Sequence, residues 1–119
     1  MNCNNQLLYA RLRILFIIAD KSYVIYKNHN YKYIFAKNIF KTNKIIYATI
    51  INNLEHFDND NIFELVIHLN NWFTQFELLE NKLENKLNEE IVFRFERIDG
   101  DMPYPKGFIN SIIKKQINE

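Results

Sequence analysis

The chain has 119 residues and a net charge of +1, and this length fits one domain, residues 1–119, with a hydrophobic core of its own. Hydrophobic residues make up 48% of the chain and aromatic residues 15%, which excludes an intrinsically disordered protein. The single cysteine, Cys3, excludes an internal disulfide and a zinc site built from several thiolates, and it fits a reducing compartment.

The first predicted element is a helix over residues 5–19, because apolar residues recur there at spacings of three and four. Residues 14–18 are all apolar, so a buried strand is an alternative for that part. The longest apolar run, residues 14–19, is much shorter than the roughly 20 residues of a membrane-spanning helix. Asp20 and Lys21 follow it, where a signal peptide would have small residues. We therefore expect a cytoplasmic protein.

The segment 23–35 places aromatic and β-branched residues on both sides of Asn28, His29 and Asn30. This pattern is typical of a hairpin, but it also fits two helices that meet at the asparagine-rich corner. The spacing of the apolar residues that follow the corner favours the helices, and both alternatives stay open at this point.

A second helix is predicted over residues 43–57, with Thr42 as its N-cap. Its expected buried stripe consists of Ile46, Ile50, Leu54 and Phe57. The short polar residues 58–61 then predict a break in the chain, because such side chains favour turns and helix N-termini.

The clearest pattern predicts a long helix over residues 61–87, whose apolar residues follow one face at spacings of three and four. Charged side chains dominate the opposite face of its second half. Phe63, Ile67 and Leu78 add apolar surface on another side. A helix that is apolar on several sides is expected in the middle of a bundle.

The last part of the chain changes pattern. Residues 91–98 alternate with period two, which predicts a strand, and a turn at 99–101 and an extended segment at 102–105 follow. A short helix is predicted over 108–117. The expected fold class is therefore mainly α, a helical bundle around one long central helix, with a short β-strand or hairpin near the C-terminus.

The second half of the chain contains a pattern of aromatic and polar residues: His68, Leu69, Asn70, Asn71, Trp72, Phe73, Phe76, Leu79, Glu80, Phe93, Phe95, Pro103, Tyr104 and Pro105. This pattern is similar to one in uncharacterised bacterial helical proteins. The resemblance implies a helical fold with an extended segment docked on it. It implies no activity and assigns no functional residue.

Catalytic and metal-binding patterns give little. His68 follows Glu64 by one helical turn, but a metal site needs three or four converging ligands. Ser22 and Ser111 lie in no nucleophile motif, and the two glycines of the chain form no phosphate-binding loop. We expect no enzyme, no metal and no cofactor.

Charge is distributed unevenly along the chain. Residues 1–54 contain eight cations and one acid, Asp20, whereas residues 55–102 contain twelve acids and four cations. The acidic part could bind a basic protein, which charge would steer towards it. The basic part, with Tyr23, Tyr26, Tyr31 and Tyr33, could instead bind RNA or DNA through phosphate contacts and stacking. A third alternative is that the two parts neutralise each other in surface ion pairs.

The abundance of Ile, Asn, Lys, Phe and Tyr, with only two glycines and two prolines, indicates an A/T-rich gene. A small acidic-surfaced chain of this style resembles a bacterial toxin-immunity protein. The resemblance implies that the partner is a cognate toxin, a basic nuclease domain whose site the chain would occlude. A further alternative is that the chain is a non-catalytic subunit of a bacterial or phage assembly. The expected contact residues are Glu77, Glu80, Glu84, Glu89, Glu90, Asp99, Asp101 and Tyr104.

Overall fold

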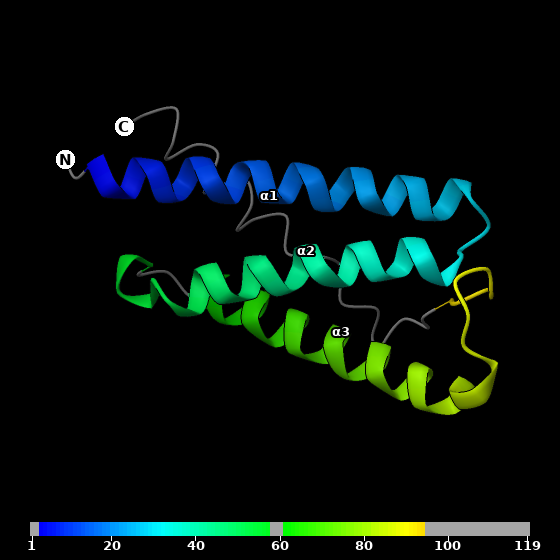
Figure 1. Ribbon diagram of the computed structural model, residues 1–119. Coiled ribbons are helices and arrows are strands. Elements are labelled where there is room, and N and C mark those ends of the chain that lie inside the picture. The colour runs from blue at the N-terminus through cyan, green and yellow to red at the C-terminus, as the bar shows by residue number, and fades with distance from the viewer. Residues whose placement is uncertain (1–2, 58–60, 95–119) are drawn as a thin grey trace.

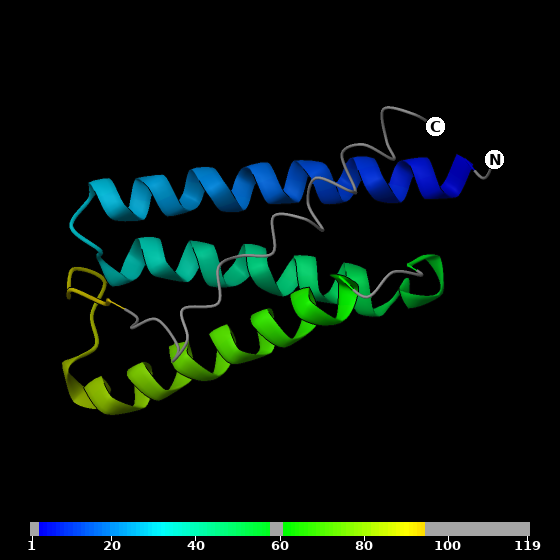
Figure 2. The ribbon, with the colours of Figure 1, turned by 180° about the vertical axis from the view of Figure 1, so that it is seen from behind.

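The computed structural model describes residues 3–57 and 61–94, and in these ranges the protein is mainly helical, as predicted. Its elements are α1 (Cys3–Asn28), α2 (Tyr33–Ile51), the short 3₁₀ helix η1 (Leu54–His56), α3 (Asn61–Leu83) and the 3₁₀ helix η2 (Glu84–Lys86). Figures 1 and 2 show α2 lying between α1 and α3, with all three running roughly alongside one another. Within the described ranges, no helix has the length and hydropathy to span a bilayer.

Helix α1 continues through residues 20–28, so the first helix is longer than predicted and the hairpin alternative for residues 23–35 is wrong. The helix ends at the asparagine-rich corner, where Asn30 has a φ of 63°. The Tyr31 amide donates to the Tyr26 carbonyl at 2.9 Å, and the two rings meet edge to face with centroids 5.1 Å apart. A left-handed residue, a bond spanning five residues and a contact across the end form a Schellman-type helix terminus.

Helix α2 begins at Tyr33 and runs through Thr42, so the prediction of an N-cap at Thr42 is wrong. The Thr42 side chain is buried, and its hydroxyl donates to the Asn38 carbonyl one turn earlier, at 3.1 Å. A threonine hydroxyl can bond inside its own helix as well as cap one, which is why the local pattern was ambiguous. The helix ends at Ile51, before the predicted end at residue 57.

Helix α3 ends at Leu83, and the predicted continuation to residue 87 is instead η2 and an extended residue. The prediction that this helix lies in the middle of the bundle is wrong. Phe63, Ile67 and Leu78 are all more than half exposed, so the side of α3 that carries them is not buried in the core.

Two adjoining clusters of buried side chains form the core. The first joins all three helices through Leu8, Tyr9, Leu12, Phe16, Ile46, Ile50, Ile62, Leu65, Leu69 and Phe73. The second lies toward the α1–α2 corner and contains Tyr26, Ala36, Ile39, Phe76 and Phe93. Of the stripe predicted for the second helix, Ile46 and Ile50 are fully buried, whereas Leu54 is 42% exposed because the helix has already ended.

The predicted strand over residues 91–98 is only partly covered by the described residues. Its described part, 91–94, forms a single antiparallel bridge between Val92 and Lys32 and no regular strand. Residues 95–98, the turn at 99–101, the extended segment at 102–105 and the helix over 108–117 lie outside the described residues.

Candidate partner-binding surface

The segment that follows α3 is tied to the start of α2. The Tyr33 amide donates to the Ile91 carbonyl at 2.9 Å and the Ile34 amide to the Glu89 carbonyl at 3.1 Å. Both amides belong to the first turn of α2, where a helix leaves its N–H groups without partners, so the segment also serves as a backbone cap. As a result, the residues after α3 return to the α1–α2 corner, as Figure 1 shows in yellow.

Phe93 fixes this segment in the core. It is fully buried, with its ring centroid 4.7 Å from that of Phe76 and 4.8 Å from that of Tyr33. The backbone of Phe93 is bonded on both sides, since its amide donates to the Tyr31 carbonyl at 2.7 Å and its carbonyl accepts the hydroxyl of buried Tyr26. Sequence reasoning placed neither residue in the core: Tyr26 was a candidate for stacking on nucleic acid, and the alternation around Phe93 was the one signal of a buried side chain.

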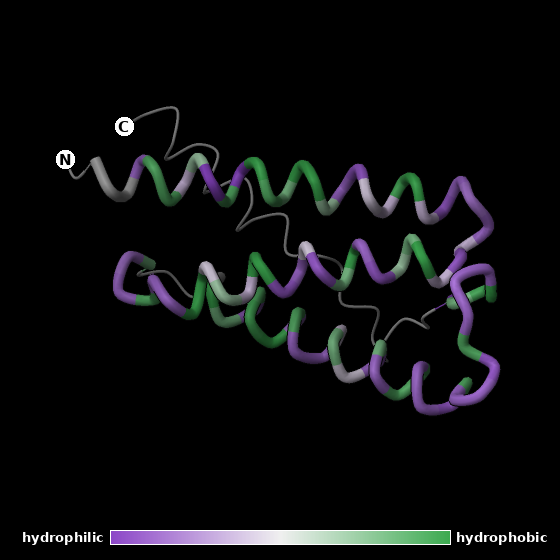
Figure 3. Tube along the Cα trace, in the orientation of Figure 1, coloured by the Kyte–Doolittle hydropathy of each residue, from purple (hydrophilic) through white to green (hydrophobic). Residues whose placement is uncertain are grey.

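Five of the expected contact residues lie at this end of the molecule: Glu77, Glu80, Glu84, Glu89 and Glu90. We call them the acidic surface. Figure 3 shows the hydrophilic run where α3 ends and η2 follows. The remaining three, Asp99, Asp101 and Tyr104, lie outside the described residues.

The members of the acidic surface differ in their contacts. Glu77, Glu84 and Glu89 are exposed and form no ion pair with any described residue. Glu90 pairs with Lys32, Oε2 to Nζ at 2.7 Å, and is 72% exposed. An exposed ion pair contributes about 0–1 kcal/mol, so Glu90 can exchange this partner at small cost.

Glu80 is the half-buried member and contacts Tyr33 of α2. The Tyr33 hydroxyl donates to Glu80 Oε2 at 2.5 Å. Burial raises the pKa of Tyr33 to about 12, and the hydrogen bond to Glu80 and its negative charge act in the same direction. Tyr33 therefore keeps its proton at neutral pH and remains the donor that orients this carboxylate between α2 and α3.

Two lysines of α2 contact aromatic rings and form no ion pair with a described carboxylate. Lys37 Nζ lies 5.1 Å from the centroid of the Tyr33 ring, and Lys44 Nζ lies 4.3 Å from that of Phe73. A cation over a ring is held by the negative face of the ring. In the described part of the chain, therefore, the basic first half neutralises little of the acidic surface.

The four tyrosines considered for stacking on nucleic acid are mostly occupied in the core. Tyr26 is 1% exposed, and Tyr31 and Tyr33 are half-buried against it and against Phe93. Tyr23 is 42% exposed. The basic half thus presents cations on its surface with little aromatic surface between them.

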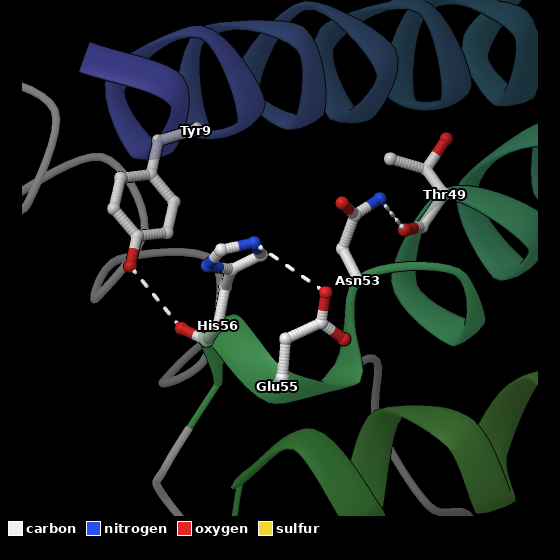
Figure 4. Close-up of polar contacts among 5 residues, drawn as sticks. All are labelled: Tyr9, Thr49, Asn53, Glu55 and His56. Carbon is white, nitrogen blue, oxygen red and sulfur yellow. Dashed lines mark hydrogen bonds and ion pairs between the residues drawn. The ribbon is translucent and has the colours of Figure 1, made fainter. Parts of the chain in front are cut away.

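The other end of the bundle contains a separate group of polar contacts around η1 (Figure 4). Tyr9 donates from its hydroxyl to the His56 carbonyl at 3.5 Å, and Asn53 Nδ2 donates to the Thr49 carbonyl at 2.7 Å. Glu55 Oε1 lies 3.5 Å from His56 Nε2. These contacts hold the turn after α2, and they are far from the acidic surface.

His68, which was considered as a metal ligand, is partly shielded from solvent. Burial lowers the pKa of His68, which is half-buried on α3. Among the side chains that the structure describes, no three from His, Cys, Asp and Glu come together in a group that could hold a metal ion.

No protein-family model, curated protein or solved structure matches this chain.

Proposed function

We propose that this protein is a bacterial immunity protein, which binds a cognate toxin domain through its acidic surface and occludes the site of a basic nuclease. Its own role is inhibitory binding, without catalysis or cofactor, and it acts in the cytoplasm, where such a nuclease would find its substrate.

The observation that carries the proposal is that Glu77, Glu84 and Glu89 form no ion pair with a described residue. These three exposed carboxylates place negative charge at this end of the molecule, where exposed Lys82 and Lys86 lie on the same segment. Such a surface accelerates the encounter with a positively charged protein and favours it over other partners. Nuclease domains need cationic groups to bind phosphates, so they provide the complementary charge.

Rigidity supports the same proposal. The Phe93 anchor and the backbone bonds to α2 hold residues 87–94 in place, and Glu80 is oriented by Tyr33. A surface that is already ordered pays little conformational entropy on binding. The carboxylates can thus meet a partner without prior rearrangement.

The test is a binding measurement with the product of the adjacent upstream gene. The purified C-terminal domain of that product is titrated with this protein by calorimetry, and its nuclease activity is assayed with and without the protein. We expect a dissociation constant between nanomolar and micromolar and loss of nuclease activity at equimolar ratio. Absence of binding, or binding that leaves nuclease activity intact, would refute the proposal.

The alternative function, binding of RNA or DNA, predicts a different result. Salt-sensitive retention of the protein on an RNA or DNA column, without binding to the adjacent product, would favour it. The burial of Tyr26 and the packing of Tyr31 and Tyr33 remove most of the stacking surface on which that alternative depends.

A further inference from the structure

Helix α1 is apolar on two opposite faces. Its inner face supplies Leu8, Leu12 and Phe16 to the core. Its outer face carries large aliphatic side chains that are 43–67% exposed: Leu7, Ile14, Ile17, Ile18, Val24 and Ile25. Figure 3 shows hydrophobic residues recurring along this helix. Residues 7–25 of a helix extend about 27 Å, so this is a continuous stripe and not an isolated exposed residue.

The stripe has the seven-residue repeat of a helix that pairs with another helix. Leu7, Ile14 and Lys21 are seven residues apart, and so are Ala10, Ile17 and Val24. Two rows with this spacing form the a and d positions of a pairing seam. Lys21 is the one charged residue in the seam, and Ala10 is its smallest.

Antiparallel pairing of two copies places the charged Lys21 of one copy opposite the small Ala10 of the other. When the residue numbers of facing positions sum to 31, Leu7 meets Val24 of the other copy and Ile14 meets Ile17. In the same register Lys21 meets Ala10, where the small side chain leaves room for the aliphatic part of the lysine.

The flanking charges also match in this arrangement. Arg13 and Asp20 lie on the same side of the stripe, seven residues apart and both exposed, and neither forms an ion pair with a described residue. In an antiparallel pair these two flanking positions face each other across the seam. Arg13 of each copy therefore meets Asp20 of the other, twice in a symmetric dimer.

We propose that the outer face of α1 is a dimer interface, in which two copies of this chain pair antiparallel through Leu7–Val24, Ile14–Ile17 and Arg13–Asp20 contacts. Because α2 lies between α1 and α3, the acidic surface of each copy stays open in such a dimer. The inference is independent of the proposed function.

The mass of the full-length protein in solution tests the interface. Light scattering and sedimentation equilibrium over a concentration series are expected to give about twice the 14.5 kDa mass of one chain. Ile14→Lys is expected to give a monomer with an unchanged helical circular dichroism spectrum. Ile45→Lys is the matched control, since Ile45 is 53% exposed on α2, and this variant should dimerise like wild type.

Charge exchange tests the orientation. Arg13→Asp and Asp20→Arg each place like charges opposite one another twice, and each is expected to weaken dimerisation at least about tenfold. Mixing the two variants restores both pairs, so the mixture should form a heterodimer with wild-type affinity.

Three results would overturn the proposal. The first is a monomeric wild-type protein at every concentration. The second is dimerisation of both charge variants at wild-type strength, which would exclude this register. The third is a monomer that binds phosphatidylglycerol vesicles through the same face, as shown by loss of vesicle binding in Ile14→Lys, because that result would assign the stripe to a membrane surface.

Discussion

Removal of the Phe93 ring is the sharpest perturbation of the part that carries the acidic surface. Phe93 is fully buried, and its ring contacts Phe76 and Tyr33 at centroid distances below 5 Å. Truncation of a buried phenylalanine costs about 3–5 kcal/mol, through lost burial and the cavity left behind. We expect Phe93→Ala to lower the free energy of unfolding by about 3 kcal/mol, a large share of the about 5–15 kcal/mol typical of a domain.

Urea denaturation followed by circular dichroism measures this loss. Val92→Ala is the matched control, because Val92 is the adjacent residue and is 59% exposed. Substitution there should change the unfolding free energy by no more than about 0.5 kcal/mol. If the two variants were equally stable, Phe93 would not be a core residue, and the segment 87–94 would not be fixed as described.

Three further perturbations follow from local geometry and titration. Glu84 has a φ of 37°, in the left-handed region that favours glycine, so Glu84→Gly should raise the unfolding free energy by up to about 1 kcal/mol. Glu77→Gly is the control, because Glu77 lies inside α3, where glycine should lower the unfolding free energy by a similar amount. Thermal denaturation of the two variants measures both changes. The pKa of Tyr33 is raised from 10.0 to about 12, so its protonated hydroxyl stabilises the fold fully below pH 10, and this contribution is lost as pH rises through 12. The unfolding free energy of Tyr33→Phe should therefore depend less on pH between 10 and 12 than that of the wild type. Burial lowers the pKa of His68 from 6.5, so the neutral side chain stabilises the fold above pH 6.5, and this contribution is lost as pH falls through the pKa of the folded state. The unfolding free energy of His68→Gln should therefore fall less on acidification than that of the wild type.

Helix content could be predicted from the sequence, because the apolar spacing of residues 5–19 and 61–87 matches the face that each helix buries. The α1–α2 corner was also among the predicted alternatives, since asparagine tolerates the left-handed geometry that Asn30 adopts. The boundaries were less accurate. Thr42 satisfies its hydroxyl inside α2, and nothing in its immediate neighbours distinguishes that bond from a cap.

The arrangement of the helices could not be predicted in the same way. Helix α3 has the composition of a central helix because of Phe63, Ile67 and Leu78, yet these side chains are exposed. The outer face of α1 likewise carries exposed aliphatic side chains. A single sequence shows which faces are apolar, but not which of them the same chain covers.

The acidic surface was partly predictable. Helical spacing identified Glu77, Glu80 and Glu84 as neighbours on the predicted helix 61–87, of which Glu84 belongs to η2 in the structure. Their environments depend on contacts between residues far apart in the sequence: Tyr33 holds Glu80, and Lys32 reaches Glu90 across the bridge. Those contacts follow from the docking of residues 87–94 on the start of α2, which no local pattern determines.

The proposed function requires that the carboxylates near the end of α3, which form no ion pair with a described residue, bind a cationic partner. Its most direct test compares two variants that each remove two negative charges, Glu77→Gln/Glu84→Gln at the acidic surface and Glu55→Gln/Glu64→Gln elsewhere, in titrations against the adjacent gene product. The first variant should bind at least about tenfold more weakly than wild type, with a shallower salt dependence, and the second should bind within about twofold of it. Equal affinities for the two variants would refute the proposed function.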